Sequence, residues 1–224
     1  MKNVTDTLEG LEYVSRGGQK LAKALDYFDI SPDSKVCLDC GASTGGFTDC
    51  LLKRGARLVY AIDVGYGQLA WSLRNDQRVI TMERTNIRYV TPEMLEVKPE
   101  LVVLDLSFIS LALVLPVVRG LMTNKNETPK RNHEVICLIK PQFEAGRGKV
   151  GKKGVVRDPK THKEVLEEFI QSAEKSGFVV QGMTYSPVKG PKGNIEYLGW
   201  LSCCGEAKHI AVDSIVSESH KNLE

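Results

Sequence analysis

The sequence predicts an α/β fold in which helices cover both faces of a mainly parallel sheet. Two observations support this fold class. Short apolar segments alternate with helical ones along most of the chain. The last two apolar segments are instead joined by a Gly- and Pro-rich connection, residues 186–194, which indicates an antiparallel hairpin at the end of the sheet.

Each apolar segment in this alternation is expected to form a strand. The strands are expected at residues 35–40, 58–63, 78–82, 101–105, 134–140, 178–185 and 196–203. Helices are expected between them, at residues 18–28, 46–54, 68–75, 92–96, 111–122 and 160–176. The resulting sheet has seven strands with one antiparallel strand, the last in the chain, unlike an ordinary nicotinamide-binding fold.

Three polar stretches fall outside this alternation. Residues 123–133 are predicted to form a solvated connector. Residues 141–159 are rich in glycine and cationic side chains, which indicates a flexible basic loop. Residues 205–224 are expected to form a polar, frayed C-terminal tail.

Length and composition limit the classes of protein to consider. The chain has 224 residues, enough for one domain with at most a small appendage, and 42% of them are hydrophobic. No apolar run is long enough to span a membrane and the first residues lack a secretory signal, so we expect a cytoplasmic protein without a membrane partner. The net charge of +2 is too small to indicate nucleic-acid binding by itself.

The six cysteines do not form a metal-site pattern. Cys37 and Cys40 lie on one expected strand, at a spacing that points their side chains to opposite faces of the sheet. No second cysteine pair with zinc-ligand spacing follows. We therefore interpret the cysteines as buried, reduced thiols and predict no metal site.

The glycine-rich turn after the first strand, residues 41–46, is the strongest functional signal. A dinucleotide fingerprint would have glycine where Ser43 stands, so that match is weak. The turn also fits the G-x-S-x-G pattern of a hydrolase nucleophile elbow, but an elbow needs several strands before it and here only one precedes it. A loop for S-adenosylmethionine (SAM) fits better, because Asp39 just before it can engage the charged amino-acid part of that cofactor.

Polar residues close the other expected strands, where ligands bind in this architecture. Asp63 ends the second strand and is expected to bind the ribose of the cofactor, whereas Asn86, after the third strand, is expected beside the adenine. Asp105 and Lys140 end the fourth and fifth strands. A charge there costs desolvation unless it is paired or functional, so a structural ion pair and a catalytic pair are both open interpretations.

Four motifs occur in a fixed order along the chain. They are YVSRGGQKL at 13–21, LDCGASTGGFTD at 38–49, LDLSFIS at 104–110 and LIKPQFE at 138–144. In this order they resemble the TlyA/hemolysin A family of FtsJ-like ribosomal RNA 2′-O-methyltransferases. The resemblance implies a Rossmann-like class I SAM-dependent methyltransferase fold, SAM as the cofactor, and ribosomal RNA or ribosomal subunits as the partner.

The resemblance also implies the site residues. FtsJ-like enzymes use a Lys-Asp-Lys-Glu tetrad, which falls here on Lys20, Asp105, Lys140 and Glu196; from position alone, Lys20 and Glu196 read equally well as solvated surface charges. A ribose hydroxyl must lose its proton, and a lysine accepts it only when burial or a second cation lowers the lysine pKa. Our hypothesis is that Lys140 is the base and that Lys20 positions the hydroxyl. The expected cofactor residues are Asp39, Gly41, Ser43, Gly45, Gly46, Phe47, Asp63, Asn86 and Asp105.

The same resemblance implies a division of the chain. Members of the family begin with a small S4-type RNA-binding domain, so residues 1–16 are interpreted as the remnant of a linker to a missing domain. Residues 17–204 are interpreted as the methyltransferase domain and 205–224 as its tail. The basic loop, with Arg16, Lys189 and Lys192, is expected to contact RNA phosphates.

Two other functions stay open at this point. One is a SAM-dependent methyltransferase of a substrate other than RNA, against which the basic loop argues. The other is cytolytic activity, as the hemolysin name suggests, which needs a membrane-inserting segment that the sequence does not display.

Overall fold

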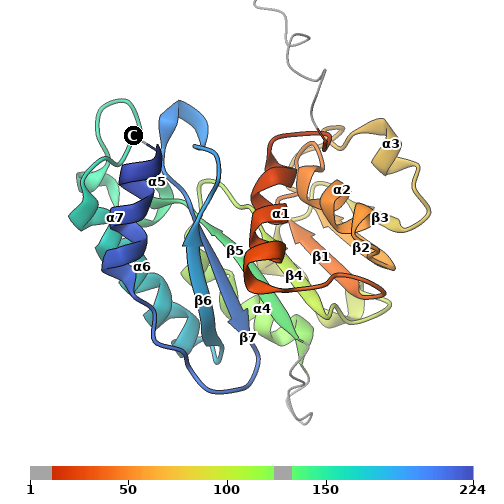
Figure 1. The fold of residues 1–224 in the computed structure, drawn as a ribbon. Helices are drawn as coiled ribbons and strands as arrows, with labels where there is room; N and C mark the ends of the chain where they lie inside the picture. The colour runs from red at the N-terminus through yellow and green to blue at the C-terminus, as the bar shows by residue number, and fades with distance from the viewer. Residues whose placement is uncertain (1–11, 124–132, 224) are drawn as a thin grey trace, which may run out of the picture.

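Seven strands form one sheet in the order β3-β2-β1-β4-β5-β7-β6 (Figure 1). The structure is a computed structural model that describes residues 12–123 and 133–223. The strands are β1 (Val36–Cys40), β2 (Leu58–Ile62), β3 (Val79–Met82), β4 (Leu101–Leu104), β5 (Glu134–Ile139), β6 (Val179–Tyr185) and β7 (Tyr197–Ser202). The helices are α1 (Gly17–Phe28), α2 (Gly46–Lys53), α3 (Trp71–Arg74), α4 (Leu115–Met122), α5 (Pro141–Glu144), α6 (Pro159–Lys175) and α7 (Val212–Leu223).

The strand directions confirm the predicted fold class. Strands β1 to β5 pair in parallel, whereas β7 pairs antiparallel with both β5 and β6. Because β7 is inserted between β5 and β6, it is the single antiparallel strand of a sheet that is otherwise parallel.

Helices cover both faces of the sheet, as Figure 1 shows. Along β1, Cys37 packs with α1 and α2, while Val36 and Leu38 pack on the opposite face with α4 and α6. This alternation follows from the two-residue period of a strand. All residues of β1 and β4 are buried, because both faces of these central strands are covered.

Strand β1 has β2 as its neighbour on one side and β4 on the other, and the chain continues from β1 to β2. The order of the strands therefore reverses between β1 and β4. In open α/β sheets a crevice forms at such a point beyond the carboxyl ends of the strands. The glycine-rich turn after β1 and Asp105 after β4 both lie there.

Several helices differ from the prediction. Helix α3 is limited to Trp71–Arg74, and residues 111–122 divide into a 3₁₀ turn, Leu111–Leu113, and α4. Pro116, near the start of α4, lacks the N–H that a continuous helix would use there. Residues 141–149, expected as loop, contain α5 and a 3₁₀ turn, Arg147–Lys149.

The C-terminal segment is the clearest correction. A polar, frayed tail was expected over 205–224, but residues 212–223 form α7. This helix packs on α6 and β6 and buries Val212 and Val216. The apolar residues of this segment are widely spaced, so their pattern was too weak to predict a helix. Their spacing of four nevertheless places them on one helical face.

Two expectations concern residues outside the described part of the chain. These are the linker remnant, most of which precedes residue 12, and most of the connector at 123–133. Among the helices of the described residues, none has the length and apolar character that crossing a membrane requires.

Candidate functional site

The glycine-rich turn connects β1 to α2 and approaches the end of β4 closely. Gly41 has φ +88°, and a Cβ at this position would collide with the backbone carbonyl of Asp105. Ser43 also has a positive φ, of 49°. Only glycine accommodates both the conformation and the contact at position 41, so the turn is fixed against β4.

Asp63, directly after β2, holds the glycine-rich turn through a hydrogen bond from Ser43. Its two carboxylate oxygens accept backbone hydrogen bonds from Ser43 at 2.8 Å and from Gly65 at 2.7 Å. The carboxylate was expected to bind a ribose. In the structure it also holds the shape of the turn, and each oxygen keeps a lone pair for a further donor.

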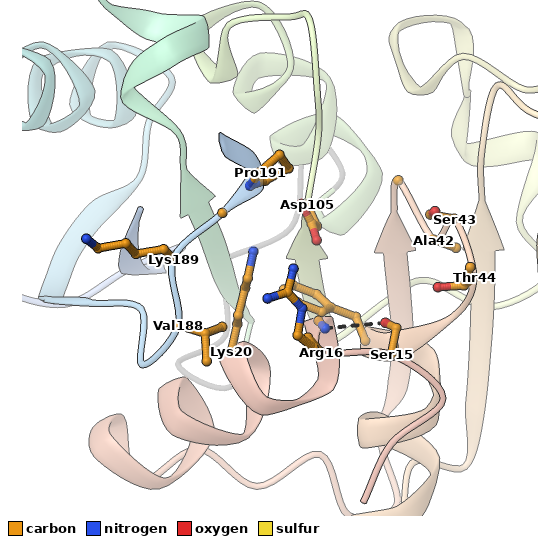
Figure 2. Close-up of a pocket in the computed structure, with 15 residues that line it drawn as sticks. Ser15, Arg16, Lys20, Ala42, Ser43, Thr44, Asp105, Val188, Lys189 and Pro191 are labelled. Atoms are coloured by element: carbon orange, nitrogen blue, oxygen red, sulfur yellow. Dashed lines mark hydrogen bonds between the residues drawn. The ribbon is translucent and has the colours of Figure 1, made fainter. Parts of the chain in front are cut away.

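Two cavities meet at this turn. The first, about 680 Å³, lies beyond the ends of β1, β2 and β4, and its lining includes Asp63, Asn86, Ile87 and Leu106; we call it the strand-end cavity. The second, about 380 Å³, is lined by Arg16, Lys20, Phe47 and Lys189, among others; we call it the basic cavity (Figure 2). Gly41, Ser43 and Asp105 line both cavities, so the two cavities adjoin at these residues.

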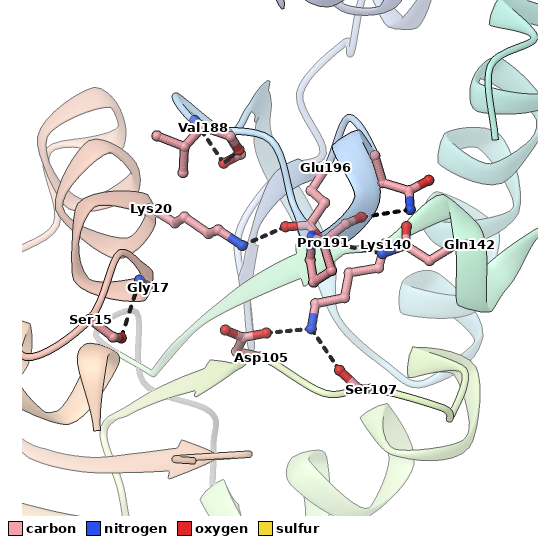
Figure 3. A network of polar contacts seen from close by, with 12 residues as sticks. Ser15, Gly17, Lys20, Asp105, Ser107, Lys140, Gln142, Val188, Pro191 and Glu196 are labelled. Carbon is pink, nitrogen blue, oxygen red and sulfur yellow. Dashed lines mark hydrogen bonds and ion pairs between the residues drawn. The ribbon is translucent and has the colours of Figure 1, made fainter. Parts of the chain in front are cut away.

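The four tetrad residues come together as two ion pairs (Figure 3). Lys20 Nζ lies 2.6 Å from Glu196 Oε2, and Lys140 Nζ lies 2.6 Å from Asp105 Oδ1. The side chain of Glu196 is fully buried, whereas that of Asp105 is 23% exposed. Each pair therefore reaches a cavity through one member: Asp105 lines both cavities and Lys20 lines the basic cavity, whereas Lys140 and Glu196 line neither.

Further polar contacts orient these pairs. Ser107 Oγ accepts a hydrogen bond from Lys140 Nζ at 3.0 Å, and Gln142 Nε2 donates to Glu196 Oε1 at 3.3 Å. Gly190 packs so closely on the Glu196 carboxylate that a Cβ there would collide with it. Sequence reasoning missed these three residues, although Ser107 and Gln142 each stand two positions after a tetrad residue.

Asp39 does not reach the cavities. Its side chain is fully buried, and Oδ2 accepts a hydrogen bond from Thr48 Oγ1 of α2 at 2.7 Å, while Oδ1 has no hydrogen-bond partner among the described residues. Burial raises the pKa of the Asp39 carboxyl to about 7; the Thr48 hydroxyl opposes this rise, and the Asp105 and Asp63 carboxylates add to it. The direct cofactor contact expected for Asp39 is therefore absent from the geometry.

Gly45 is the second expected cofactor residue that lines neither cavity. It has φ +97°, and a Cβ there would collide with Leu73 of α3. Glycine at position 45 therefore allows the turn to pack closely on α3. The remaining expected residues line at least one cavity: Gly41, Ser43, Gly46, Phe47, Asp63, Asn86 and Asp105.

Comparison with known proteins agrees with this geometry. A family model described as FtsJ-like methyltransferase matches residues 13–203. The chain belongs to the FtsJ-like methyltransferases. The resemblance inferred from the four motifs is thereby confirmed, and the tetrad pairs lie within the matched range.

Individual relatives are similar over most of the chain. The 16S/23S rRNA (cytidine-2′-O)-methyltransferase TlyA of Mycobacterium tuberculosis is 51% identical over 189 residues, covering 84% of this chain and 68% of that protein. The crystal structure of a candidate hemolysin from Lactococcus lactis is 46% identical, with a TM-score of 0.86 over 93% of this chain and 98% of that one. Fibrillarin of Aeropyrum pernix, solved with S-adenosyl-L-methionine, is 13% identical with a TM-score of 0.56 over 83% of this chain and 75% of that one, which supports the fold alone.

The residues of the FtsJ-like site fit an elongated cofactor such as SAM. The strand-end cavity offers apolar side chains and the Asp63 carboxylate, which suit a nucleoside. The basic cavity offers Arg16 and Lys20, which suit a carboxylate. Gly41, which lines both cavities, lets the turn pack directly on the Asp105 backbone.

Phe108 is a further site residue that the sequence did not single out. It follows Asp105 on the loop after β4, has φ +65°, and lines the strand-end cavity. Its side chain is 90% exposed, and its ring lies 4.9 Å from that of Phe143. A strained backbone under an exposed aromatic side chain is typical of a functional position.

Proposed function

We propose that this protein transfers the methyl group of SAM to the 2′-hydroxyl of a ribose in ribosomal RNA, in the cytoplasm. Family membership supports methyl transfer, and the name of the TlyA relative supports ribosomal RNA as the substrate. The observation that carries the proposal is the 2.6 Å contact between Lys140 Nζ and Asp105, the residue of the pair that lines both cavities. It lies where a cofactor in one cavity would meet a hydroxyl group from outside.

The chemistry needs a base and an in-line approach. When bound, SAM would supply a methyl group on a sulfonium, and transfer of that methyl would leave the C–S electron pair on sulfur. For this step the Lys140 ammonium first releases its own proton to solvent, and the amine then accepts the proton of the 2′-hydroxyl while that oxygen forms the new C–O bond. Asp105 and Ser107 then hold the resulting ammonium at hydrogen-bond distance.

The second pair positions the substrate. Lys20 lines the basic cavity at the N-terminal end of α1, and Glu196 holds its ammonium in place. A cation fixed there donates a hydrogen bond to the ribose oxygen and favours its negative charge in the transition state. Gln142 keeps the other oxygen of Glu196 occupied, so the carboxylate does not rotate away.

Several cations around the basic cavity suit RNA phosphates. Arg16 and Lys192 are exposed, and Lys189 lines the cavity. Lys152 and Lys153, in the basic segment after α5, are exposed as well. Phosphate contacts of this kind position an RNA substrate, while an exposed aromatic ring such as Phe108 can stack on an unpaired base.

Methyl transfer from tritiated SAM to undermethylated ribosomal subunits tests the proposal. The expected product is a 2′-O-methyl nucleotide, located by digestion and mass spectrometry. Transfer to protein or small molecules, with none to ribosomal RNA, would overturn it in favour of a different methyltransferase substrate. Because the Lactococcus lactis relative carries a hemolysin name, the same preparation should also be assayed for red-cell lysis, with the Lys140→Ala variant as its enzymatically inactive control.

A further inference from the structure

The peptide unit at Val156 is held from two sides. Its N–H donates to Asn194 Oδ1 at 3.1 Å, and its carbonyl oxygen accepts from His162 Nε2 at 3.0 Å. Val156 is 3% exposed, and Asn194 is 2% exposed. This buried peptide therefore connects two parts of the molecule, the hairpin between β6 and β7 and the helices α6 and α7.

Asn194 makes the connection on the hairpin side. Besides accepting from Val156, its amide donates to the carbonyl oxygens of Gly154 at 3.0 Å and Pro191 at 3.2 Å. Asn194 thus joins the turn at 151–155 to the hairpin, and it stands two residues before Glu196 on the same extended segment. The turn is compact, because the Gly151 N–H donates to the Val155 carbonyl at 3.1 Å.

Helices α6 and α7 hold the other end of the Val156 peptide. The carbonyl of Val156 can only accept, so His162 donates to it from Nε2. The other ring nitrogen, Nδ1, lies 3.2 Å from His220 Nε2 of α7. The Tyr197 hydroxyl lies 2.8 Å from that Nδ1 and 2.9 Å from Ser219 Oγ of α7. Tyr197 directly follows Glu196 in the chain. The contacts that α6 and α7 make with Tyr197 therefore lie one residue away from the tetrad.

The segment held by Asn194 carries the cations of the proposed RNA contact. Lys152 and Lys153 lie on the turn at 151–155, where their side chains are exposed. On the hairpin, Lys192 Nζ lies close to the Gly154 backbone. The hydrogen bonds of Asn194 therefore fix the position of these cations relative to Glu196.

We propose that Asn194 is a positioning residue for methyl transfer, because through the Val156 peptide it sets the basic turn at 151–155 in register with the hairpin that carries Glu196. The expected effect of Asn194 on kcat/KM rests on the proposed function, whereas its expected effect on the backbone at 150–157 does not. An amide is needed because one side chain must both accept a hydrogen bond and donate two. An alanine side chain neither accepts nor donates hydrogen bonds, and an aspartate carboxylate only accepts them.

Three variants test the proposal on the full chain. Asn194→Ala removes all three hydrogen bonds, and Asn194→Asp keeps acceptance from Val156. Asn222→Ala is the matched control, because it removes the hydrogen bond that an asparagine of α7 donates to Tyr185. The measurements are amide hydrogen exchange over 150–157, SAM affinity by calorimetry, and kcat and KM on undermethylated ribosomal subunits.

We expect Asn194→Ala to raise exchange over 150–157 at least about tenfold and to lower kcat/KM for RNA by about 10- to 100-fold, with SAM affinity changed less than about twofold. Asn194→Asp should keep exchange at the Val156 amide slow and recover part of kcat/KM, while Asn222→Ala should match the wild type in both. Unchanged exchange in Asn194→Ala would overturn the structural link. Faster exchange with unchanged kcat/KM would overturn the positioning role.

Failure of the proposed function has a different signature. In that case the wild type itself does not methylate ribosomal RNA, while exchange and SAM affinity still report on Asn194. A variant that only loses melting temperature, with wild-type activity per folded molecule, also counts against positioning.

Discussion

Lys20 and Glu196 are 176 residues apart in the sequence and form an ion pair of 2.6 Å in the structure. The Glu196 side chain is fully buried and that of Lys20 is 10% exposed. A buried ion pair adds little net stability, because the desolvation of both charges offsets their attraction. A functional role for the pair therefore explains its presence better than stabilisation does.

Glu196→Gln should separate these two roles when it is combined with Lys20→Met. The single variant leaves a buried ammonium without its counter-charge, so the free energy of unfolding should fall by about 3 kcal/mol. The double variant removes both charges and should regain most of that stability, yet methyl transfer should stay at least about 100-fold below wild type. Urea unfolding and the tritiated-SAM assay measure the two effects. Recovery of both stability and transfer in the double variant would refute the catalytic role.

Lys140→Ala should abolish methyl transfer and leave the cofactor site intact. Loss of the proposed base should lower kcat by about 10²- to 10⁴-fold. SAM affinity should change little, because Lys140 lines neither the strand-end nor the basic cavity. Calorimetry with SAM and single-turnover transfer provide the measurements, with exposed Lys175→Ala on α6 as the control. Full transfer by the Lys140 variant would show that another group takes the proton.

Asp39→Asn should make the protein more stable at neutral pH. The pKa of Asp39 is about 7 in the folded protein, against 3.8 for an unperturbed carboxyl. The folded state therefore binds more protons than the unfolded state between these values, and wild-type stability falls as pH rises from about 4 to about 7. Asparagine does not ionise, so the variant should lack this fall and exceed the wild type by about 4 kcal/mol at pH 8.

Urea unfolding from pH 4 to pH 8 measures the difference for Asp39→Asn. The two proteins should differ least near pH 4, where the carboxyl is protonated in both states. Parallel pH profiles for variant and wild type would mean that Asp39 ionises in the folded protein as it does in the unfolded chain.

Phe108→Ala should weaken RNA recognition. The exposed ring beside Asp105 and against Phe143 is placed to stack on an unpaired base, a contact worth about 1–3 kcal/mol. We expect KM for RNA to rise roughly tenfold, a change of about 1.4 kcal/mol. Phe108→Tyr should retain most of the affinity. An unchanged KM together with weakened SAM binding would instead place the ring against the cofactor.

Replacing Lys152 and Lys153 together by Gln should lower RNA affinity and its dependence on salt. For each lysine that binds a phosphate, its replacement should reduce the slope of log affinity against log salt by about 1. Replacing Lys149 by Gln is a useful comparison, because Lys149 Nζ lies 2.6 Å from Glu164 Oε2 on α6 and is thus already paired with a carboxylate. Binding titrations at several salt concentrations measure the slopes. The same slope in the double variant and the wild type would exclude these two lysines from the RNA interface.

The sequence determined the fold class and predicted the glycine-rich turn and the charged strand ends, because these depend on local patterns, whereas Lys20 and Glu196 were implied only by the family resemblance. Apolar runs of strand length, a glycine-rich turn and charged strand ends are visible in the chain, and the sheet topology then brings the strand ends together. Asp105 and Lys140 follow adjacent parallel strands, β4 and β5, so their pairing follows from the sheet order.

Only the tertiary structure decided what depends on contacts between distant segments. It showed that Asp39 is buried and accepts a hydrogen bond from Thr48, and that a Cβ at Gly45 would collide with Leu73. It also showed that α7 is packed and that Asn194 joins the hairpin to the basic turn. Burial and hydrogen-bond partners of this kind are set by side chains far away in the sequence, which local periodicity does not report.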